Sequence, residues 1–281
     1  MIELLGYEFM QRALIAAIAT GIAAPVIGTY LVQRRLSLMG DGIGHVAVTG
    51  VAIGLLTGWS PTWTAVLVAA LGALLLEVIR ERGHTSGDLA LALLFYGGLA
   101  AGVMITGIAG QNAARLQQYL FGSLTTISVA DVWFTMALAA AVVLLGLGLS
   151  PQLFAVAQDR DFAVVAGLRV RVYNMLIAVL AAVTVTVAMR TVGLLLVSAL
   201  MVVPVAASQQ VARSFRGTLL LAMLVGLVAG VGGLLVSAEL SFHATVAPGP
   251  AIVLLALAMF VLAWPLGAWL RRRERGRRLS A

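Results

Sequence analysis

The amino-acid sequence predicts an all-α, polytopic membrane helix bundle with about eight or nine transmembrane helices. Hydrophobic residues make up 62% of its 281 positions, and only 10% of the positions are charged. Soluble globular domains average about 45–50% apolar and about 25% charged residues. A soluble core could not bury this excess, so lipid must surround much of the surface. No hydrophilic stretch is long enough to form a separate domain, and residues 1–281 are expected to form a single transmembrane domain.

Nine stretches are long and apolar enough to cross a bilayer as helices, which takes about 20 residues each. Helix-breaking residues mark several boundaries between them, such as Ser150 and Pro151. An eight-helix arrangement stays open if one short stretch is re-entrant. The expected spans are 9–33, 42–58, 61–80, 88–109, 129–149, 172–190, 192–211, 217–238 and 250–270.

The placement of the arginines indicates how these spans are oriented. With the N-terminus outside and nine alternating spans, most arginines fall on the inner side, as the positive-inside rule requires. The protein is then a multi-pass protein of the cell membrane with a cytoplasmic C-terminus. The inner arginines are Arg34, Arg35, Arg80, Arg82, Arg160, Arg169, Arg171, Arg213, Arg216 and the six between Arg271 and Arg278; the outer ones are Arg12, Arg115 and Arg190.

All 18 basic residues are arginine, and the sequence has no cysteine. Without lysine the chain cannot carry a P-loop, whose lysine reaches the phosphates of ATP. Without cysteine it has neither disulfides nor thiolate metal sites. The net charge of +7 does not indicate nucleic-acid binding, because the arginines lie at helix ends and in the tail, where membrane topology explains them.

The stretch 28–58 holds polar groups that hydrophobic helices rarely retain without a task. Arg34 and Arg35 end one span, a glycine-broken turn follows, and the next span opens with Asp41 and His45. Their spacing of four places both side chains on one helix face. A carboxylate and an imidazole are acceptable ligands of Zn²⁺ and Mn²⁺ alike, and ionisable groups inside a membrane often mark an ion path. The pair therefore predicts a site for a divalent metal ion that crosses the membrane.

Two ligands are too few for a tight metal site, and the sequence leaves undecided what completes it. A two-fold dimer with this face on its axis would bring four ligands, two aspartates and two histidines. The structural alternative is that Asp41 caps the second span while His45 hydrogen-bonds within the bundle. The depth of the pair is open as well: it lies either low in the membrane or on an unwound segment, 40–44, that reaches the midplane.

Two further segments are amphipathic and do not span the membrane. A short interfacial helix is expected over Gln111–Ser128 on the outer side. Leu153–Arg171 lies on the inner side and combines charged residues with an apolar stripe of Phe162, Val165 and Ala166. A helix of this kind could press into a groove on a partner protein; the alternative is a loop helix that packs on lipid headgroups.

Six blocks of the chain follow one another in an order that is specific when taken together. The most specific is RRLSLMGDGIGHVAVTGVAIG (34–54), which looks like a pattern of Arg-Arg-Met-Ser, then Gly-Asp, then a histidine four residues on. Together the blocks resemble the ABC-3 family, the membrane permeases of bacterial ABC importers for zinc, manganese and iron. The other blocks are GDLALALLFYGGLAAGV (87–103), QYLFGSL (118–124), DFAVVAGLRV (161–170), TVGLLLVSALMVVPVAAS (191–208) and APGPAIVLL (247–255).

This resemblance implies a permease that carries Zn²⁺ or Mn²⁺, with Fe²⁺ as a third candidate, and that holds no permanent cofactor. It implies a homodimer, or sometimes a heterodimer, driven by a separate cytoplasmic ATPase and supplied by an extracytoplasmic metal-binding protein. The chain itself is then not an enzyme. The resemblance also implies that the segment 153–171 couples the permease to the ATPase, with the contacts Asp159, Asp161, Phe162, Gly167 and Arg169.

One block departs from the family pattern. Before its Pro-Gly pair the family often carries an aspartate after a Ser-aromatic pair, and Thr245 stands at that position here. An outer metal contact through that carboxylate is therefore not carried over. Glu239 and His243 lie nearby and are the candidate outer metal contacts instead.

Two other functions are compatible with a hydrophobic bundle but have less support. A secondary transporter driven by an ion gradient usually buries several acidic residues along its path, whereas only Asp41 is a good candidate for a deep carboxylate. An intramembrane enzyme needs a catalytic motif, and the sequence has neither H-E-x-x-H nor G-x-S-x-G. Glu77 is expected to form an ion pair within its own helix, with Arg80 and Arg82 beside it.

Overall fold

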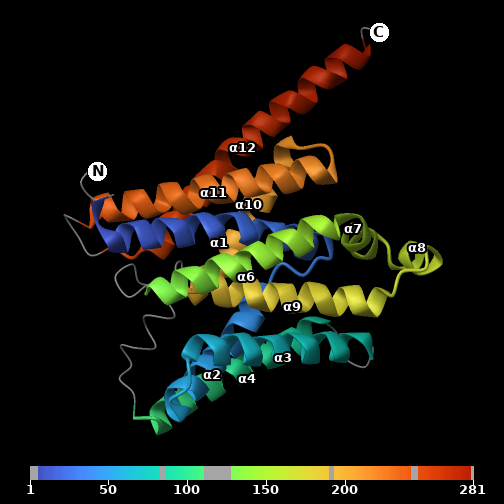
Figure 1. Cartoon of the computed structure of the whole chain (residues 1–281). Coiled ribbons are helices and arrows are strands. Elements are labelled where there is room, and N and C mark those ends of the chain that lie inside the picture. Colours follow the sequence, from blue (N-terminus) through green and yellow to red (C-terminus); the bar gives the residue numbers. More distant parts are fainter. Residues whose placement is uncertain (1–5, 83–86, 111–127, 190–192, 242–245, 280–281) are drawn as a thin grey trace.

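The helices pack as a bundle in the computed structural model of the chain (Figure 1), which describes residues 6–82, 87–110, 128–189, 193–241 and 246–279. The interfacial helix expected over 111–128 falls outside these residues except for Ser128. The helices are α1 (Glu8–Gln33), α2 (Met39–Thr57), α3 (Pro61–Glu81), α4 (Gly87–Ile108), α6 (Val129–Gly148), α7 (Ser150–Gln158), α8 (Arg160–Val165), α9 (Val170–Met189), α10 (Leu194–Val211), α11 (Phe215–Leu240) and α12 (Pro248–Leu279).

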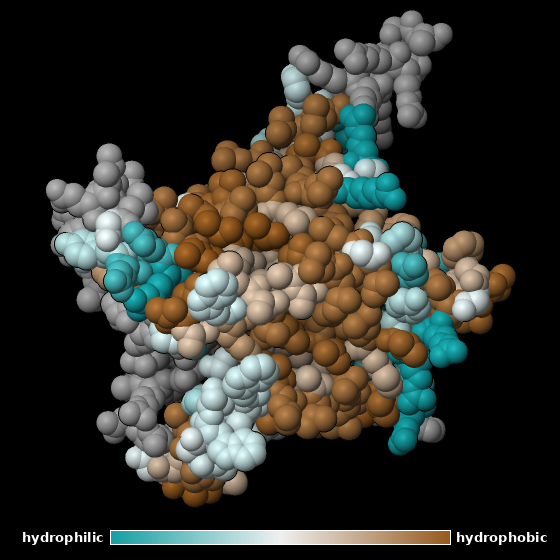
Figure 2. Space-filling model, viewed as in Figure 1, coloured by the Kyte–Doolittle hydropathy of each residue, from teal (hydrophilic) through white to brown (hydrophobic). Residues whose placement is uncertain are grey.

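Within the described residues, eight helices are long and apolar enough to cross a membrane: α1, α2, α3, α4, α6, α9, α11 and α12. Helix α10 is also apolar but shorter, and it accounts for the ninth expected span. Figure 2 shows a broad hydrophobic belt over the middle of the bundle, with hydrophilic residues gathered toward its two ends. The predicted all-α, polytopic fold with eight or nine spans is confirmed.

The last helix is longer than the sequence predicted. Helix α12 continues to Leu279, whereas the expected span ends near residue 270. The apolar part ends at Arg272, but arginine is a good helix former, so the backbone stays helical beyond it. Figure 1 shows this end of α12 diverging from the other helices.

Helix α1 lies in the middle of the bundle and contacts α6, α7, α9, α10 and α11. The buried apolar residues in its second half belong to one apolar core that also includes parts of α2, α3 and α9. The fully buried Tyr30 donates its hydroxyl hydrogen to the carbonyl oxygen of Gly146 at 2.6 Å, which ties α1 to the end of α6. The end of α1 is therefore in contact with the end of α6 as well as with the apolar core.

Helices α1 and α11 cross at small residues. A Cβ atom on Gly21 would lie 2.7 Å from the carbonyl oxygen of Gly226, and one on Gly230 would lie 3.0 Å from the carbonyl oxygen of Ala17. In lipid, small residues allow helices to approach closely and associate by packing. The spacing of Gly226 and Gly230 in the sequence predicted such a contact, and the structure shows that the partner is α1.

A tight turn connects α1 to α2 and fixes where α2 begins. The N–H of Leu36 donates to the carbonyl of Leu31 at 2.8 Å, and the N–H of Arg35 donates to that of Val32 at 3.0 Å. These are the two hydrogen bonds of a Schellman motif, in which glycine usually takes the left-handed position. Arg35 occupies it instead, with a φ of +57°. An L-residue in this conformation is strained by about 1–2 kcal/mol.

The segment 153–171, expected as one helix, contains two short helices and the start of α9. Asp159 separates α7 from α8: its backbone is extended, and its carboxylate accepts the N–H groups of Asp161 at 2.9 Å and Phe162 at 3.0 Å. A capping carboxylate offers the backbone an alternative to continuing the previous helix. Gly167, with a φ of +78°, then turns the chain toward α9.

Candidate metal site and docking surface

Asp41 and His45 lie one turn apart near the start of α2, as the sequence predicted. The Asp41 side chain is half-buried, and His45 is only 4% exposed. Residues 40–44 are helical, so the unwound alternative for this segment is wrong. The pair therefore lies on a continuous helix, close to the arginine-bearing turn that precedes α2.

Helix α4 covers His45 from one side. The ring of Phe95 meets the imidazole edge-on, with 4.1 Å between the ring centroids. A Cβ on Gly98 would lie 3.0 Å from the carbonyl oxygen of His45, so this glycine lets α4 approach α2 closely. The hydroxyl of Thr49, one turn further along α2, donates to the carbonyl oxygen of Gly98 at 2.7 Å. His45 is thus held between two closely packed helices.

Over the residues it describes, the structure does not show the two structural roles considered for this pair, in which Asp41 would cap α2 and His45 would hydrogen-bond within the bundle. The residue that caps α2 is Leu38, and Asp41 lies inside the first turn. The Nδ1 atom of His45 is buried and has no hydrogen-bond partner among the described residues. A buried nitrogen left unsatisfied costs about 1–3 kcal/mol. The imidazole therefore offers a lone pair or an N–H group that the described protein atoms do not use.

Sequence reasoning missed Ser198, a half-buried residue of α10 whose hydroxyl oxygen is buried. Its hydroxyl has no hydrogen-bond partner among the described residues, and it lies 3.3 Å from the position that a Cβ on Gly40 would take. This places one more oxygen beside the start of α2. Serines inside apolar helices commonly donate to a carbonyl one turn back, as Ser208 does to Pro204 at 2.7 Å. The sequence therefore carried no signal that Ser198 differs.

The described part of the chain holds no group of three or more His, Asp or Glu side chains that could bind a metal ion together. Of the two candidate outer contacts, Glu239 is exposed in the last turn of α11. His243 lies outside the described residues. Near that end of α11, Leu234 and Ala238 pack against the first turns of α1, so Glu239 lies at the bundle end where α1 begins.

Glu77 forms the expected ion pair within α3 and a second one that was not expected. Its two carboxylate oxygens lie 2.8 Å from Nη1 of Arg80 and 3.0 Å from Nη2 of Arg34. The side chain of Glu77 is 2% exposed and that of Arg34 is 9% exposed. The second pair joins residues 43 positions apart, and a contact of this kind leaves no local pattern in a sequence.

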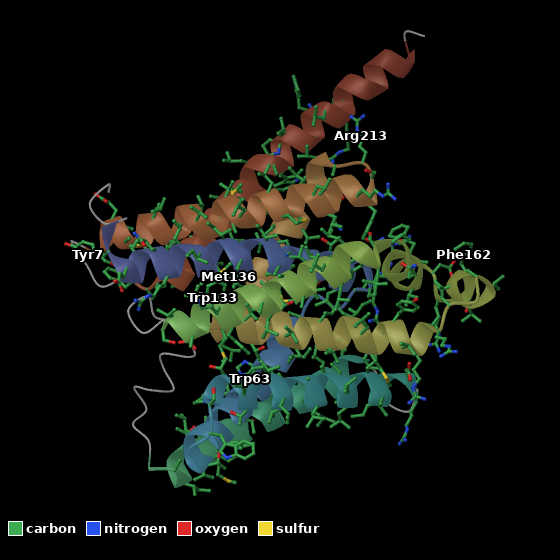
Figure 3. The ribbon with its side chains drawn as sticks, viewed as in Figure 1. Tyr7, Trp63, Trp133, Met136, Phe162 and Arg213 are labelled. Atoms are coloured by element: carbon green, nitrogen blue, oxygen red, sulfur yellow. The ribbon has the colours of Figure 1, made fainter. Side chains whose placement is uncertain are left out.

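Helix α8 projects from one end of the bundle and presents apolar side chains there. Figure 3 shows Phe162 at its tip, directed away from the other helices. Phe162 is 62% exposed and Val165 is 87% exposed, while Ala163 on the opposite side is fully buried. The apolar stripe predicted from the sequence, including Ala166, is therefore exposed. An exposed apolar patch of this kind marks a surface that contacts a partner or lipid.

The other residues predicted to contact an ATPase have different positions. Asp161 and Arg169 are exposed beside the stripe. The carboxylate of Asp159 caps α8, and Gly167 forms the turn that follows α8. These two exposed residues determine the backbone path on either side of α8.

Comparison with known proteins places the chain in a family. A family model described as the ABC 3 transport family matches residues 6–266. The manganese import system permease protein ScaB of Streptococcus parasanguinis is 31% identical over 258 residues, which cover 92% of this chain and 90% of that protein. The manganese transport system membrane protein MntC of Halalkalibacterium halodurans is 32% identical over 280 residues, which cover 98% and 94% respectively.

A solved structure agrees with this assignment. PsaBC from Streptococcus pneumoniae in complex with Fab contains a chain that superimposes with a TM-score of 0.85 at 30% sequence identity, covering 97% of this chain and 98% of that one. Both the sequence and the arrangement of the helices are therefore shared over nearly the full length. The chain belongs to the ABC 3 transport family, and it is the membrane permease of an ABC transporter whose ATPase is a separate subunit.

Proposed function

We propose that this permease carries Mn²⁺ into the cell along a path that includes Asp41 and His45. The observation that supports this most directly is the buried Nδ1 of His45, which lacks a protein partner one turn from a half-buried carboxylate. A carboxylate and an imidazole suit Mn²⁺, Zn²⁺ and Fe²⁺. Manganese is favoured because two of the relatives with 31–32% identity are named for manganese transport.

The path needs more ligands than one chain offers at this point. In a homodimer with α2 near the two-fold axis, the second subunit would supply another Asp41 and His45. The Ser198 hydroxyl is a further oxygen near the start of α2. A site with few ligands binds the ion only moderately tightly, which suits transport because an ion that binds too tightly cannot leave.

The partners follow from the orientation of the bundle. The arginine distribution in the sequence supports a cell-membrane protein with its C-terminus in the cytoplasm. The exposed stripe on α8 would then face the cytoplasm, where it would dock on the separate ATPase. An extracytoplasmic metal-binding protein would deliver the ion at the opposite end, near Glu239 and His243. All 281 residues would act as one permease domain. An ion-gradient carrier is set aside, because the chain belongs to an ABC family.

The experiment is ATP-driven Mn²⁺ uptake by proteoliposomes that contain the permease, its ATPase and the metal-binding protein. We expect Asp41→Asn and His45→Gln each to lower uptake at least about tenfold, since each removes a proposed ligand. The ATPase should still co-purify with both variants. Thr49→Val is the matched control, because it removes a polar group one turn further along α2 and should leave uptake within about twofold of the unsubstituted protein.

Two outcomes would contradict the proposal in different ways. Full uptake by both the Asp41→Asn and the His45→Gln variants would remove these residues from the path. Uptake of Zn²⁺ or Fe²⁺ in place of Mn²⁺ by the unsubstituted protein would keep the path but change its cargo.

A further inference from the structure

Three ion pairs form a chain across the end of the bundle that carries α7 and α8. Nε of Arg171, in the first turn of α9, lies 2.9 Å from Oε2 of Glu81. One turn earlier in α3, Glu77 contacts both Arg80 at 2.8 Å and Arg34 at 3.0 Å. The ion pairs therefore connect the start of α9, through the last turns of α3, to the residue that ends α1.

Glu77 is the centre of this chain, and its burial is unusual for a charged residue. Each of its oxygens faces a different arginine, and almost none of its side chain is exposed. Arg34 is nearly as buried, and its second terminal nitrogen, Nη1, has no partner among the described residues. Buried ion pairs can often be replaced by apolar residues without loss of stability. Stability alone therefore does not explain why this cluster is charged.

A cavity of about 300 Å³ lies beside the cluster. Arg34 and Glu77 line one part of its wall, and Gln158 and Arg160, where α7 ends and α8 begins, line another. The side chain of Gln33 donates to the side-chain oxygen of Gln158 across the contact between α1 and α7. The α7–α8 segment is thus tied to the end of α1 by a polar contact, and the cavity leaves space between this segment and the buried ion pairs.

Arg34 is also the last residue before the strained turn into α2. Arg35 follows it in the left-handed conformation, and the hydrogen bonds of that turn fix the direction in which α2 starts. Asp41 lies in the first turn of α2. A displacement of Arg34 is therefore passed to the Asp41 end of α2 through a short, stiff connection.

We propose that Glu77 and Arg34 are positioning residues that transmit movement of the α7–α8 segment to Asp41 and His45. The inference depends on the proposed function for the role of Asp41 and His45 and for ATPase docking on α8. In this role the Glu77 carboxylate holds the end of α1 and the end of α3 together. A shift of α7 and α8 then moves the start of α2, because α1 and α3 cannot slide past each other.

The test uses the complete transporter in proteoliposomes and compares Mn²⁺ transported per ATP hydrolysed. Glu77→Gln keeps the shape of the side chain but removes the charge. We expect this variant to assemble and to hydrolyse ATP within about twofold of the unsubstituted protein. Its transport per ATP should fall at least about fivefold. Glu81→Gln is the matched control, because it breaks the more exposed pair on the same helix and should keep the ratio.

A second measurement follows the movement itself, independently of any metal. Because the sequence has no cysteine, Leu38→Cys and Val172→Cys provide one pair of spin-label sites in each permease subunit, at exposed positions next to α2 and at the start of α9. ATP binding should change the distance between the labels in the otherwise unsubstituted protein. In the Glu77→Gln background that change should be lost.

A triple variant, Arg34→Met, Glu77→Leu and Arg80→Met, separates transmission from stability by making the cluster apolar. It should assemble and remain stable but stay uncoupled. A normal transport ratio in Glu77→Gln or in the triple variant would overturn the inference. So would failure of both to assemble, because the cluster would then serve only the fold. If even the unsubstituted transporter moves no metal, the proposed function fails, while the spin-label distances still test Glu77.

Discussion

Nη2 of Arg34 and Oε1 of Glu77 lie 3.0 Å apart, and both side chains are more than nine-tenths buried. This contact brings the end of α1 against the last turns of α3. It is reinforced by Arg80, which pairs with the other oxygen of the same carboxylate. The result is a compact charged cluster at the bundle end where α2 begins.

The first prediction concerns the stability of this cluster. Glu77→Ala should lower the free energy of unfolding by about 3–5 kcal/mol, because it leaves two buried or half-buried arginines without their shared partner. Thermal unfolding of the detergent-solubilised permease measures the effect. Arg171→Ala is the control: it breaks a pair in which the arginine is mostly exposed, and it should cost no more than about 1 kcal/mol. Equal losses in the two variants would contradict the assignment.

Ser198 provides a prediction about metal handling. If its unpartnered hydroxyl contributes to the path, Ser198→Ala should raise the Mn²⁺ concentration needed for half-maximal uptake by about tenfold. Ser208→Ala is the natural comparison, because the hydroxyl it removes is already bonded to the carbonyl of Pro204. Uptake curves over a range of Mn²⁺ concentrations distinguish the two. Identical curves for Ser198→Ala and the unsubstituted protein would show that the hydroxyl does not contribute to the ion path.

Much of the fold could be predicted from the sequence because lipid imposes strong length and composition requirements on each helix. The nine spans and the pairing of Asp41 with His45 on one face both follow from local rules. The break at Asp159 was missed because capping and helix continuation compete at an aspartate, and apolar helical residues both precede and follow it.

Contacts between distant parts of the chain are the other class that could not be predicted. Arg80 lies one turn from Glu77 and was sufficient as its expected ion-pair partner, so the sequence offered no reason to look for a second partner such as Arg34. The same holds for Ser198, whose significance depends on a glycine in another helix. These features arise from how helices pack, and a single sequence does not record that packing.

The exposed stripe on α8 predicts where the ATPase docks. Val165→Asp should reduce co-purification of the ATPase at least about tenfold, because it places a charge at the centre of an apolar contact. The fold should be unaffected, since Val165 is almost fully exposed. Val129→Asp introduces the same charge at an exposed site at the other end of the bundle, and it should leave the complex intact. Retention of the ATPase by Val165→Asp would place the docking surface elsewhere.

Gly226, in the interior of α11, and Gly107, near the end of α4, should respond to alanine with opposite signs. Gly226→Ala puts a methyl group against the backbone of Gly21 and the ring of Pro25, and such overpacking should cost about 1–3 kcal/mol. Gly107 has open space around its Cβ position, so Gly107→Ala should stabilise α4 by about 0.5–1 kcal/mol through helix propensity. Unfolding temperatures measured side by side give the sign of each change. A stabilised Gly226→Ala would show that α1 and α11 are less tightly packed than described.

The seclusion of His45 beneath Phe95 has a consequence for which ions can pass. An ion that reaches Nδ1 in so narrow a place must first give up most of the water molecules that accompany it in solution. Magnesium, although abundant in cells, parts with its hydration shell reluctantly and prefers oxygen donors in a strict octahedron. The same packing that hides the imidazole would therefore act as a filter against magnesium, without any residue dedicated to excluding it.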